Sequence, residues 1–130
     1  MTSWSEDEIK EIAVSDYPHI SPFRDDGVTY GTPTWIWTVL IDGALYVRAC
    51  NGHASRWYQA AMRQRSGRIS VACMTRDVSF EPGADQVNEL IDAACRVKHR
   101  NSSYLGSMIS TRSRAATVKI LPASELRNPC

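Results

Sequence analysis

The sequence predicts an α+β domain built on a small antiparallel β-barrel of about six strands, with two or three flanking helices. Short strand-like segments follow one another along the chain and are separated by turn signals, as in hairpin-linked strands. Segments with helical periodicity interrupt them. Consecutive antiparallel strands in a small domain usually curl, because closure removes exposed edges. An open sheet with helices on one face is the alternative.

The composition fits one globular domain spanning residues 1–130, since 43% of the residues are hydrophobic and 22% are charged. A formal net charge of +1 provides no bulk field that would favour nucleic acid or a membrane surface. The acidic N-terminus has no apolar signal segment, and no apolar run reaches the length of a membrane span. The four cysteines match no zinc or iron–sulfur spacing. We therefore expect a cytoplasmic protein with reduced cysteines and no metal.

The first elements are a helix and an edge strand. Ser5 and Glu8 form a capping box, and apolar residues follow at helical spacing, so a short amphipathic helix is expected over residues 5–15. The next segment, residues 17–23, contains two prolines. It suits an edge strand, because proline cannot donate to an inner ladder.

The strongest strand prediction is residues 34–41, which are rich in aromatic and β-branched side chains. Asp42-Gly43 is a hairpin signal, so residues 44–49 are expected to return as the antiparallel partner. After a glycine-containing loop, Ser55 is a plausible N-cap for a helix over residues 56–65.

The second half predicts a hairpin, a long helix and a final strand. Residues 67–73 and 76–81 alternate in polarity and are close enough to form a hairpin. A helix is expected over residues 84–99, with one apolar face formed by Val87, Leu90, Ile91, Ala94 and Val97. A polar, irregular stretch follows, and residues 116–121 form the last strand.

Two groups near the first hairpin could hold an anion. Tyr46 and Arg48 share one strand face; if that face lines the barrel interior, an anionic ligand would balance Arg48, and if it faces outward, Arg48 is solvated. Ser55 and Arg56 open a helix, where free N–H groups, a hydroxyl and a guanidinium can hold phosphate or carboxylate. A capped helix with a surface arginine is the alternative.

Other polar and aromatic side chains are candidates for acid/base chemistry or substrate contact. Trp35 and Trp37 share a strand face and could stack on a flat ring, or they could belong to the core or a dimer interface. The segment before the last strand could close over a site; its candidate residues are Tyr104, Met108 and Arg112. The candidate acids and bases are Asp77, Tyr46, His53, Tyr58 and Lys98.

Seven motifs along nearly the whole chain resemble the bacterial DUF2255 family, whose function is not generally known. They are Trp37/Val39, Asp42–Arg48, Asn51–Tyr58, Gly67–Ile69, Arg76–Phe80, Ile91–Lys98 and Arg114–Pro122.

The order of strands, helix and basic motifs is also remotely similar to the flavin-binding split β-barrels of the pyridoxamine-phosphate-oxidase type. That resemblance implies a homodimer with FMN or the deazaflavin F420 at the subunit interface. It implies that Arg48, Ser55 and Arg56 hold the phosphate, with Asn51 and Trp57 in the same segment, and that Arg76 lies near the ring. Trp57 stands where a lysine is common, and Asp77 where an amide is common.

Three functions follow from these observations. The first is a flavin or deazaflavin oxidoreductase that acts on a small-molecule substrate. The second is a cofactor-independent isomerase or cyclase with a hydrophobic organic substrate in the barrel cavity. The third is a non-catalytic module that binds a small ligand.

Overall fold

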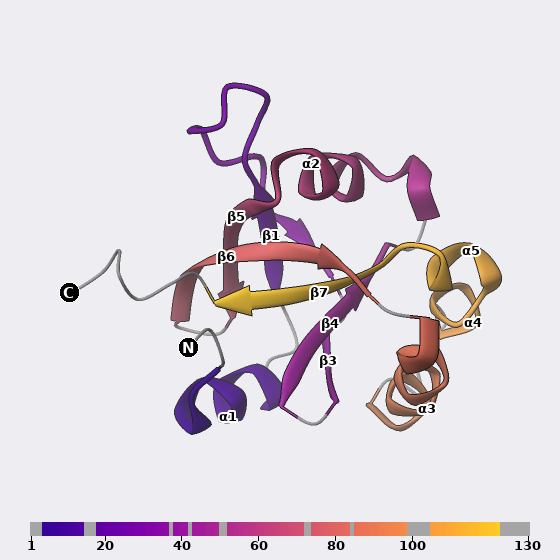
Figure 1. Ribbon diagram of the computed structural model, residues 1–130. Helices are drawn as coiled ribbons and strands as arrows, with labels where there is room; N and C mark the ends of the chain where they lie inside the picture. The colour runs from indigo at the N-terminus through magenta and orange to yellow at the C-terminus, as the bar shows by residue number, and fades with distance from the viewer. Residues whose placement is uncertain are drawn as a thin grey trace.

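The computed structural model describes residues 4–14, 18–36, 38–41, 43–49, 52–71, 74–83, 85–98 and 105–122. Within them, a seven-stranded antiparallel sheet curls into a half-barrel with helices packed around it (Figure 1). The predicted α+β class and barrel-like sheet are confirmed.

The elements follow one another as hairpins interrupted by helices. The strands are β1 (His19–Pro22), β2 (Thr34–Trp35), β3 (Thr38–Ile41), β4 (Ala44–Arg48), β5 (Ser66–Val71), β6 (Met74–Pro82) and β7 (Thr117–Pro122). The longer helices are α1 (Glu6–Val14), α2 (Arg56–Gln64) and α3 (Asn88–Lys98). The short helical turns are η1 (Gly52–Ala54), η2 (Asp85–Val87), α4 (Leu105–Met108) and α5 (Thr111–Arg114).

The segment over residues 34–41 supplies both edge strands of the sheet, β2 and β3. The strand order is β2-β1-β5-β6-β7-β4-β3, so the two outermost strands are neighbours in sequence. Ile36 N–H still donates to the Pro18 carbonyl oxygen at 3.1 Å, and Thr38 already pairs with Val47. The predicted single strand over residues 34–41 is therefore divided, because the chain crosses here from one edge to the other.

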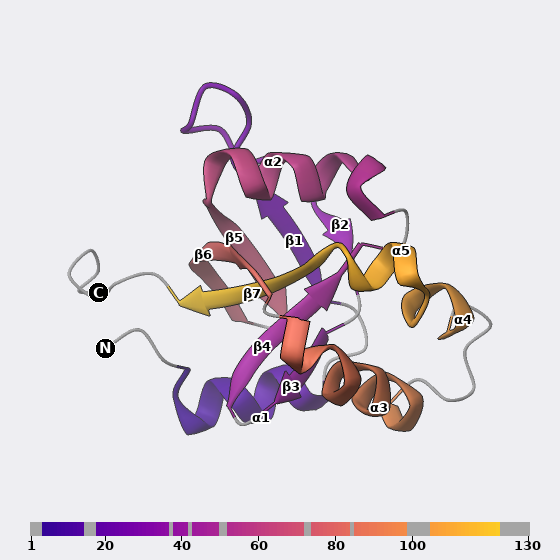
Figure 2. The same ribbon diagram turned by 45° about the vertical axis from the view of Figure 1, so that its right-hand side comes forward.

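The barrel interior is filled by aliphatic and aromatic side chains. They come from alternate positions of the strands and form one buried cluster that includes Ile20, Leu45, Val47, Ile69, Phe80 and Ile120. Helix α1 packs into this cluster through Ile12, and α2 packs into it through Ala61. The two helices lie at opposite ends of the sheet (Figure 2).

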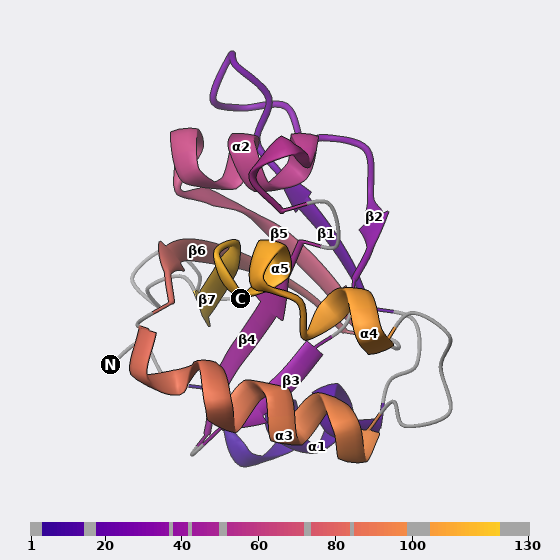
Figure 3. The ribbon, with the colours of Figure 1, turned by 90° about the vertical axis from the view of Figure 1, so that its right-hand side faces the viewer.

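A second, smaller core lies outside the barrel, between the sheet and α3. Val39 and Tyr46 from β3 and β4 pack there against Ile91 and Cys95 (Figure 3). Burial raises the pKa of the Cys95 thiol, which keeps it protonated and unreactive. Leu90 and Val97, which were predicted to lie on the buried face of this helix, point to solvent instead.

No helix within the described ranges has the length and apolar character that crossing a bilayer requires.

The close packing of β5 against β1 yields a stability prediction. A Cβ at Gly67 would lie 2.5 Å from the Ser21 carbonyl oxygen and 2.6 Å from Pro22 Cα. Gly67→Ala should therefore lower the free energy of unfolding by roughly 1–3 kcal/mol, measured by chemical denaturation. Gly106→Ala is the matched control, since nothing lies within 4 Å of its Cβ. Equal stability of the two variants would contradict the packing described.

Candidate functional site

A cleft of about 430 Å³ lies between α2 and the loop that joins β1 to β2. Its helix side includes Arg56, Trp57 and Arg63, and its loop side includes Phe23 and Arg24. The remaining lining residues are Pro22, Asp25, Gly31, Thr32, Thr34, Gln59 and Ala60. Three arginines and one aspartate therefore border a single cavity, which gives it an excess of positive charge.

The loop wall of the cleft is held by an aspartate-centred turn. Asp26 Oδ1 accepts from the N–H groups of Val28 and Thr29 at 2.9 and 2.8 Å, and the Thr29 hydroxyl donates to Asp26 Oδ2 at 2.5 Å. The Thr29 hydroxyl and these N–H groups lower the pKa of Asp26 to about 2. Gly27 has φ 75°, a conformation that glycine adopts without strain. The turn is thus fixed by its own sequence.

A stack of side chains supports the same wall from the sheet. The rings of Phe23 and Tyr30 stack with their centroids 4.9 Å apart, and the Arg68 guanidinium lies 3.8 Å from the Tyr30 centroid. The Tyr30 hydroxyl donates to Asp77 Oδ1 at 2.7 Å, and this hydrogen bond is the main cause of the raised pKa of Tyr30. Asp77, a predicted acid or base, here anchors the loop that carries Phe23.

The helix wall presents cations at the start of α2. Ser55 precedes the helix in an extended conformation, but its side chain makes no capping hydrogen bond, and the first turn has no acidic residue. Arg56 and Trp57 occupy that turn and line the cleft. About two turns further along the helix, Arg63 Nη2 lies 2.8 Å from Asp25 Oδ1, and this ion pair joins helix and loop across the cleft.

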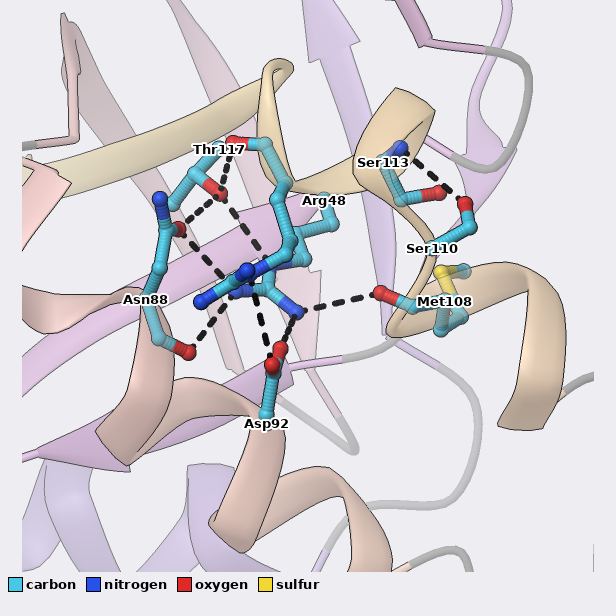
Figure 4. Close-up of polar contacts among 8 residues, drawn as sticks. Arg48, Asn88, Asp92, Met108, Ser110, Ser113 and Thr117 are labelled. Carbon is cyan, nitrogen blue, oxygen red and sulfur yellow. Dashed lines mark hydrogen bonds and ion pairs between the residues drawn. The ribbon is translucent and has the colours of Figure 1, made fainter.

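Arg48 lies elsewhere, on the outer face of β4 beneath α3, and is only 2% exposed. Its Nε donates to Thr117 Oγ1 at 3.1 Å, and Nη2 donates to the Asn88 carbonyl oxygen and Oδ1 at 3.1 and 3.0 Å (Figure 4). Its Nη1 donates to Asp92 Oδ1 and, at 3.1 Å, to the Met108 carbonyl oxygen. The sequence predicted that Arg48 would either face the barrel interior and bind an anion or face outward and be solvated. It does neither, because it faces outward but is buried beneath α3. All five N–H groups of the guanidinium are engaged, so none is left for a ligand.

The same network ties the last helical turns to the sheet. Asp92 Oδ2 lies 3.3 Å from Arg114 Nε, and the Thr117 hydroxyl lies 3.0 Å from the Arg114 carbonyl oxygen. Ser110 Oγ caps α5 by accepting from the Ser113 N–H at 3.3 Å. One buried cation therefore connects β4, β7, α3, α4 and α5.

The other predicted acid/base residues are dispersed. Tyr46 is buried in the core beneath α3. Lys98 Nζ donates to the carbonyl oxygen and hydroxyl of Thr38 at 2.8 and 3.0 Å, so it fastens the end of α3 to β3. Tyr58 packs half-buried against the barrel core. His53 lies in η1, and its side chain is outside the part that the structure describes.

The remaining candidates for cofactor and substrate contact that the structure describes lie in different parts of the molecule. Arg76 forms an ion pair with Glu8 and lies 5.8 Å from the ring centroid of Trp4, at the α1 end of the barrel. Trp35 is 43% exposed on β2, and the Met108 side chain is buried beneath α3. Asn51, Trp37, Tyr104 and the side chain of Arg112 lie outside the described residues.

Of the predicted set, the cleft contains Arg56 and Trp57, with Ser55 immediately before them. Sequence reasoning missed Arg63 and the loop side of the cleft, including Phe23 and Arg24. A signal for Arg63 was present in its seven-residue spacing from Arg56, which places both on one face of a helix. Within the described ranges, no group of histidine, cysteine and acidic side chains could hold a metal ion.

Comparisons with known proteins point to a family and a fold. The model of the DUF2255 family, described as "Uncharacterized protein conserved in bacteria", matches residues 8–120. The crystal structure of the conserved hypothetical protein Rv2991 from Mycobacterium tuberculosis is similar, with a TM-score of 0.60 and 15% identity over 98% of this chain and 83% of that one. At that identity the similarity shows the fold alone. No curated protein matches the chain.

The buried ion pair yields a prediction about Asp92. Asp92→Ala leaves the Arg48 guanidinium buried without its counter-ion, so the free energy of unfolding should fall by about 3–5 kcal/mol. Chemical denaturation measures this change. Asp25→Ala is the control: Asp25 also pairs with an arginine, but its side chain is 84% exposed. Removal of such a surface pair should cost less than about 1 kcal/mol. Similar losses in both variants would contradict the role of Arg48.

The Tyr30–Asp77 hydrogen bond yields a prediction about pH. The pKa of Tyr30 is raised in the folded state, so its contribution to stability is full below about pH 10 and is lost as pH rises through the folded-state pKa. Tyr30→Phe lacks this contribution at every pH. Denaturation of both proteins from about pH 8 to pH 11 should show a stability difference that shrinks at the alkaline end. A difference that is independent of pH would argue against the hydrogen bond.

Proposed function

The chain belongs to the DUF2255 family, and we propose that it binds an anionic small molecule with a flat ring in the cleft beside α2. One observation carries this proposal: three arginines and the Trp57 ring line the same cavity. At about 430 Å³ the cavity is in the size range of small-molecule sites.

The chemistry of the lining residues defines the class of ligand. A guanidinium offers a planar fork of N–H donors that matches phosphate and carboxylate oxygens. Arg56 and Arg63 approach the cleft from α2, and Arg24 approaches it from the loop, where Nη2 also donates to Thr32 Oγ1 at 3.3 Å. Phe23 and Trp57 present aromatic surface for a ring. A bound anion would compete with Asp25 for Arg63.

An oxidoreductase that uses FMN or F420 is the enzymatic form of this proposal, because both cofactors join a phosphate to a flat ring. The phosphate grip that the split-barrel resemblance implies does not fit, since Arg48 is engaged on the far side of β4. Such a cofactor would have to place its phosphate on the cleft arginines instead. When bound, it would supply the electron chemistry, while Arg56 and Trp57 would hold and orient it.

The cofactor-independent isomerase or cyclase has less support. Its candidate acids and bases are spread over separate places, with Tyr46 beneath α3, Lys98 at the end of α3 and Asp77 beside Tyr30. The barrel interior, where its hydrophobic substrate was expected, is occupied by packed side chains. A non-catalytic binding module needs no such set of acids and bases, because the cleft alone could hold its ligand.

Calorimetric titration tests the proposed site, with FMN, F420 and ringless pyrophosphate as probes. Arg56→Gln should raise the dissociation constant of every probe that binds by about tenfold or more, since a hydrogen bond to a charged group is worth about 1.5–3 kcal/mol. Trp57→Leu should weaken only the probes that carry a ring.

Lys10→Gln, on α1 at the other end of the barrel, removes a cation away from the cleft and should leave binding unchanged. Absence of binding by every probe would refute an anion site of this kind, and so would equal affinities of wild type and Arg56→Gln. Binding of pyrophosphate but of neither ring-bearing probe would refute the flavin form alone.

A further inference from the structure

Helix α3 has a second apolar surface, directed away from the core that it covers. Leu90 and Val97 are 52% and 78% exposed, and the exposed Ala93 lies between them. Beside this stripe is an apolar groove of about 410 Å³ between α3 and β3, lined by Val39, Leu40, Ala93, Ala94, Val97 and Lys98. None of the described elements covers the stripe, and Figure 3 shows α3 on the outside of the molecule.

The spacing of the stripe is that of a helix–helix seam. Leu90, Ala93 and Val97 are three and four residues apart, the spacing of a and d positions in a heptad. Ile91 and Cys95, on another side of the helix, already pack against the sheet. A helix that covers a sheet normally needs one apolar face. The second face of α3 is therefore not explained by the fold of a single chain.

The charges beside the stripe favour a second copy of the same helix. Glu89 lies in the first turn and Arg96 in the last, both exposed and seven residues apart, so they border the stripe on one side. In an antiparallel pair, Glu89 of each copy approaches Arg96 of the other. In a parallel pair, the Glu89 and Arg96 side chains of the two copies lie on opposite outer edges and form no such pair.

We propose that two copies of this chain associate through their α3 stripes in an antiparallel, two-fold symmetric pair. Leu90 of each protomer packs beside the partner's Val97, and the small Ala93 and Ala94 near the axis let the helices approach closely. The interface is isologous, because each copy contributes the same surface. It lies apart from the strand face of Trp35, which the sequence left open as a dimer interface.

The size of the stripe sets the strength of the association. With 11 residues, α3 is about 16 Å long, and one helix pair is smaller than the roughly 800 Å² per partner of a standard interface. The groove along β3 adds apolar area. We therefore expect a reversible dimer with a dissociation constant in the micromolar range, weakened at high salt.

Sedimentation velocity of the full chain, over about 1 to 200 μM, tests the proposal, with circular dichroism of each variant to verify folding. Val97→Glu places a charge in the seam and should raise the dissociation constant at least about tenfold. Glu89→Arg and Arg96→Glu should each weaken the dimer, because like charges then meet twice. The double variant Glu89→Arg/Arg96→Glu should restore it, because opposite charges meet again.

Lys10→Glu reverses a charge on α1, away from the stripe, and should not change the dissociation constant. A protein that stays monomeric over the whole range overturns the proposal. So does a dimer that persists unchanged in folded Val97→Glu, since the contact must then lie elsewhere. Failure of the folded double variant to recover the affinity lost in the single variants overturns the antiparallel arrangement.

Discussion

The buried guanidinium of Arg48 is the constraint on which the arrangement of the C-terminal half depends. A cation withdrawn from water is tolerated only when each of its N–H groups has a partner and its charge is balanced. Asp92 balances the charge, while Asn88, Thr117 and the Met108 carbonyl complete the hydrogen bonds. These partners come from α3, β7 and α4, so the network fixes the position of each relative to β4.

The rotation of α3 follows from the same network. Because Asn88 and Asp92 must face the sheet to reach Arg48, the helix turns its Leu90–Val97 edge outward. The exposed apolar stripe is thus a consequence of burying an arginine. The arginines on the two sides of the barrel therefore differ: Arg48, beneath α3, makes all its hydrogen bonds within the chain, whereas the arginines beside α2 line a cavity.

Local patterns predicted most of the fold, and long-range contacts account for what they missed. Alternation and turn signals located the strands, and a capping box located α1, whose Ser5 and Glu8 bond to each other's N–H groups at 3.2 and 2.8 Å. Period-2 alternation placed Arg48 on one face with Tyr46, but it cannot tell which element covers that face. The crossing of the chain from β2 to β3 was missed, because strand propensity is continuous through residues 34–41. The loop side of the cleft was missed, because the loop between β1 and β2 lines a cavity only through its long-range packing beside α2.

Whether an anion binds beside α2 and not at Arg48 can be measured by titrating ¹⁵N-labelled protein with pyrophosphate and recording ¹H–¹⁵N correlation spectra. We expect shifts at the amides of residues 23–32, Arg56 and Trp57, with the Arg48 Nε–H and Asn88 side-chain signals unchanged. Shifts centred on Arg48 and Asn88, with α2 silent, would contradict this expectation.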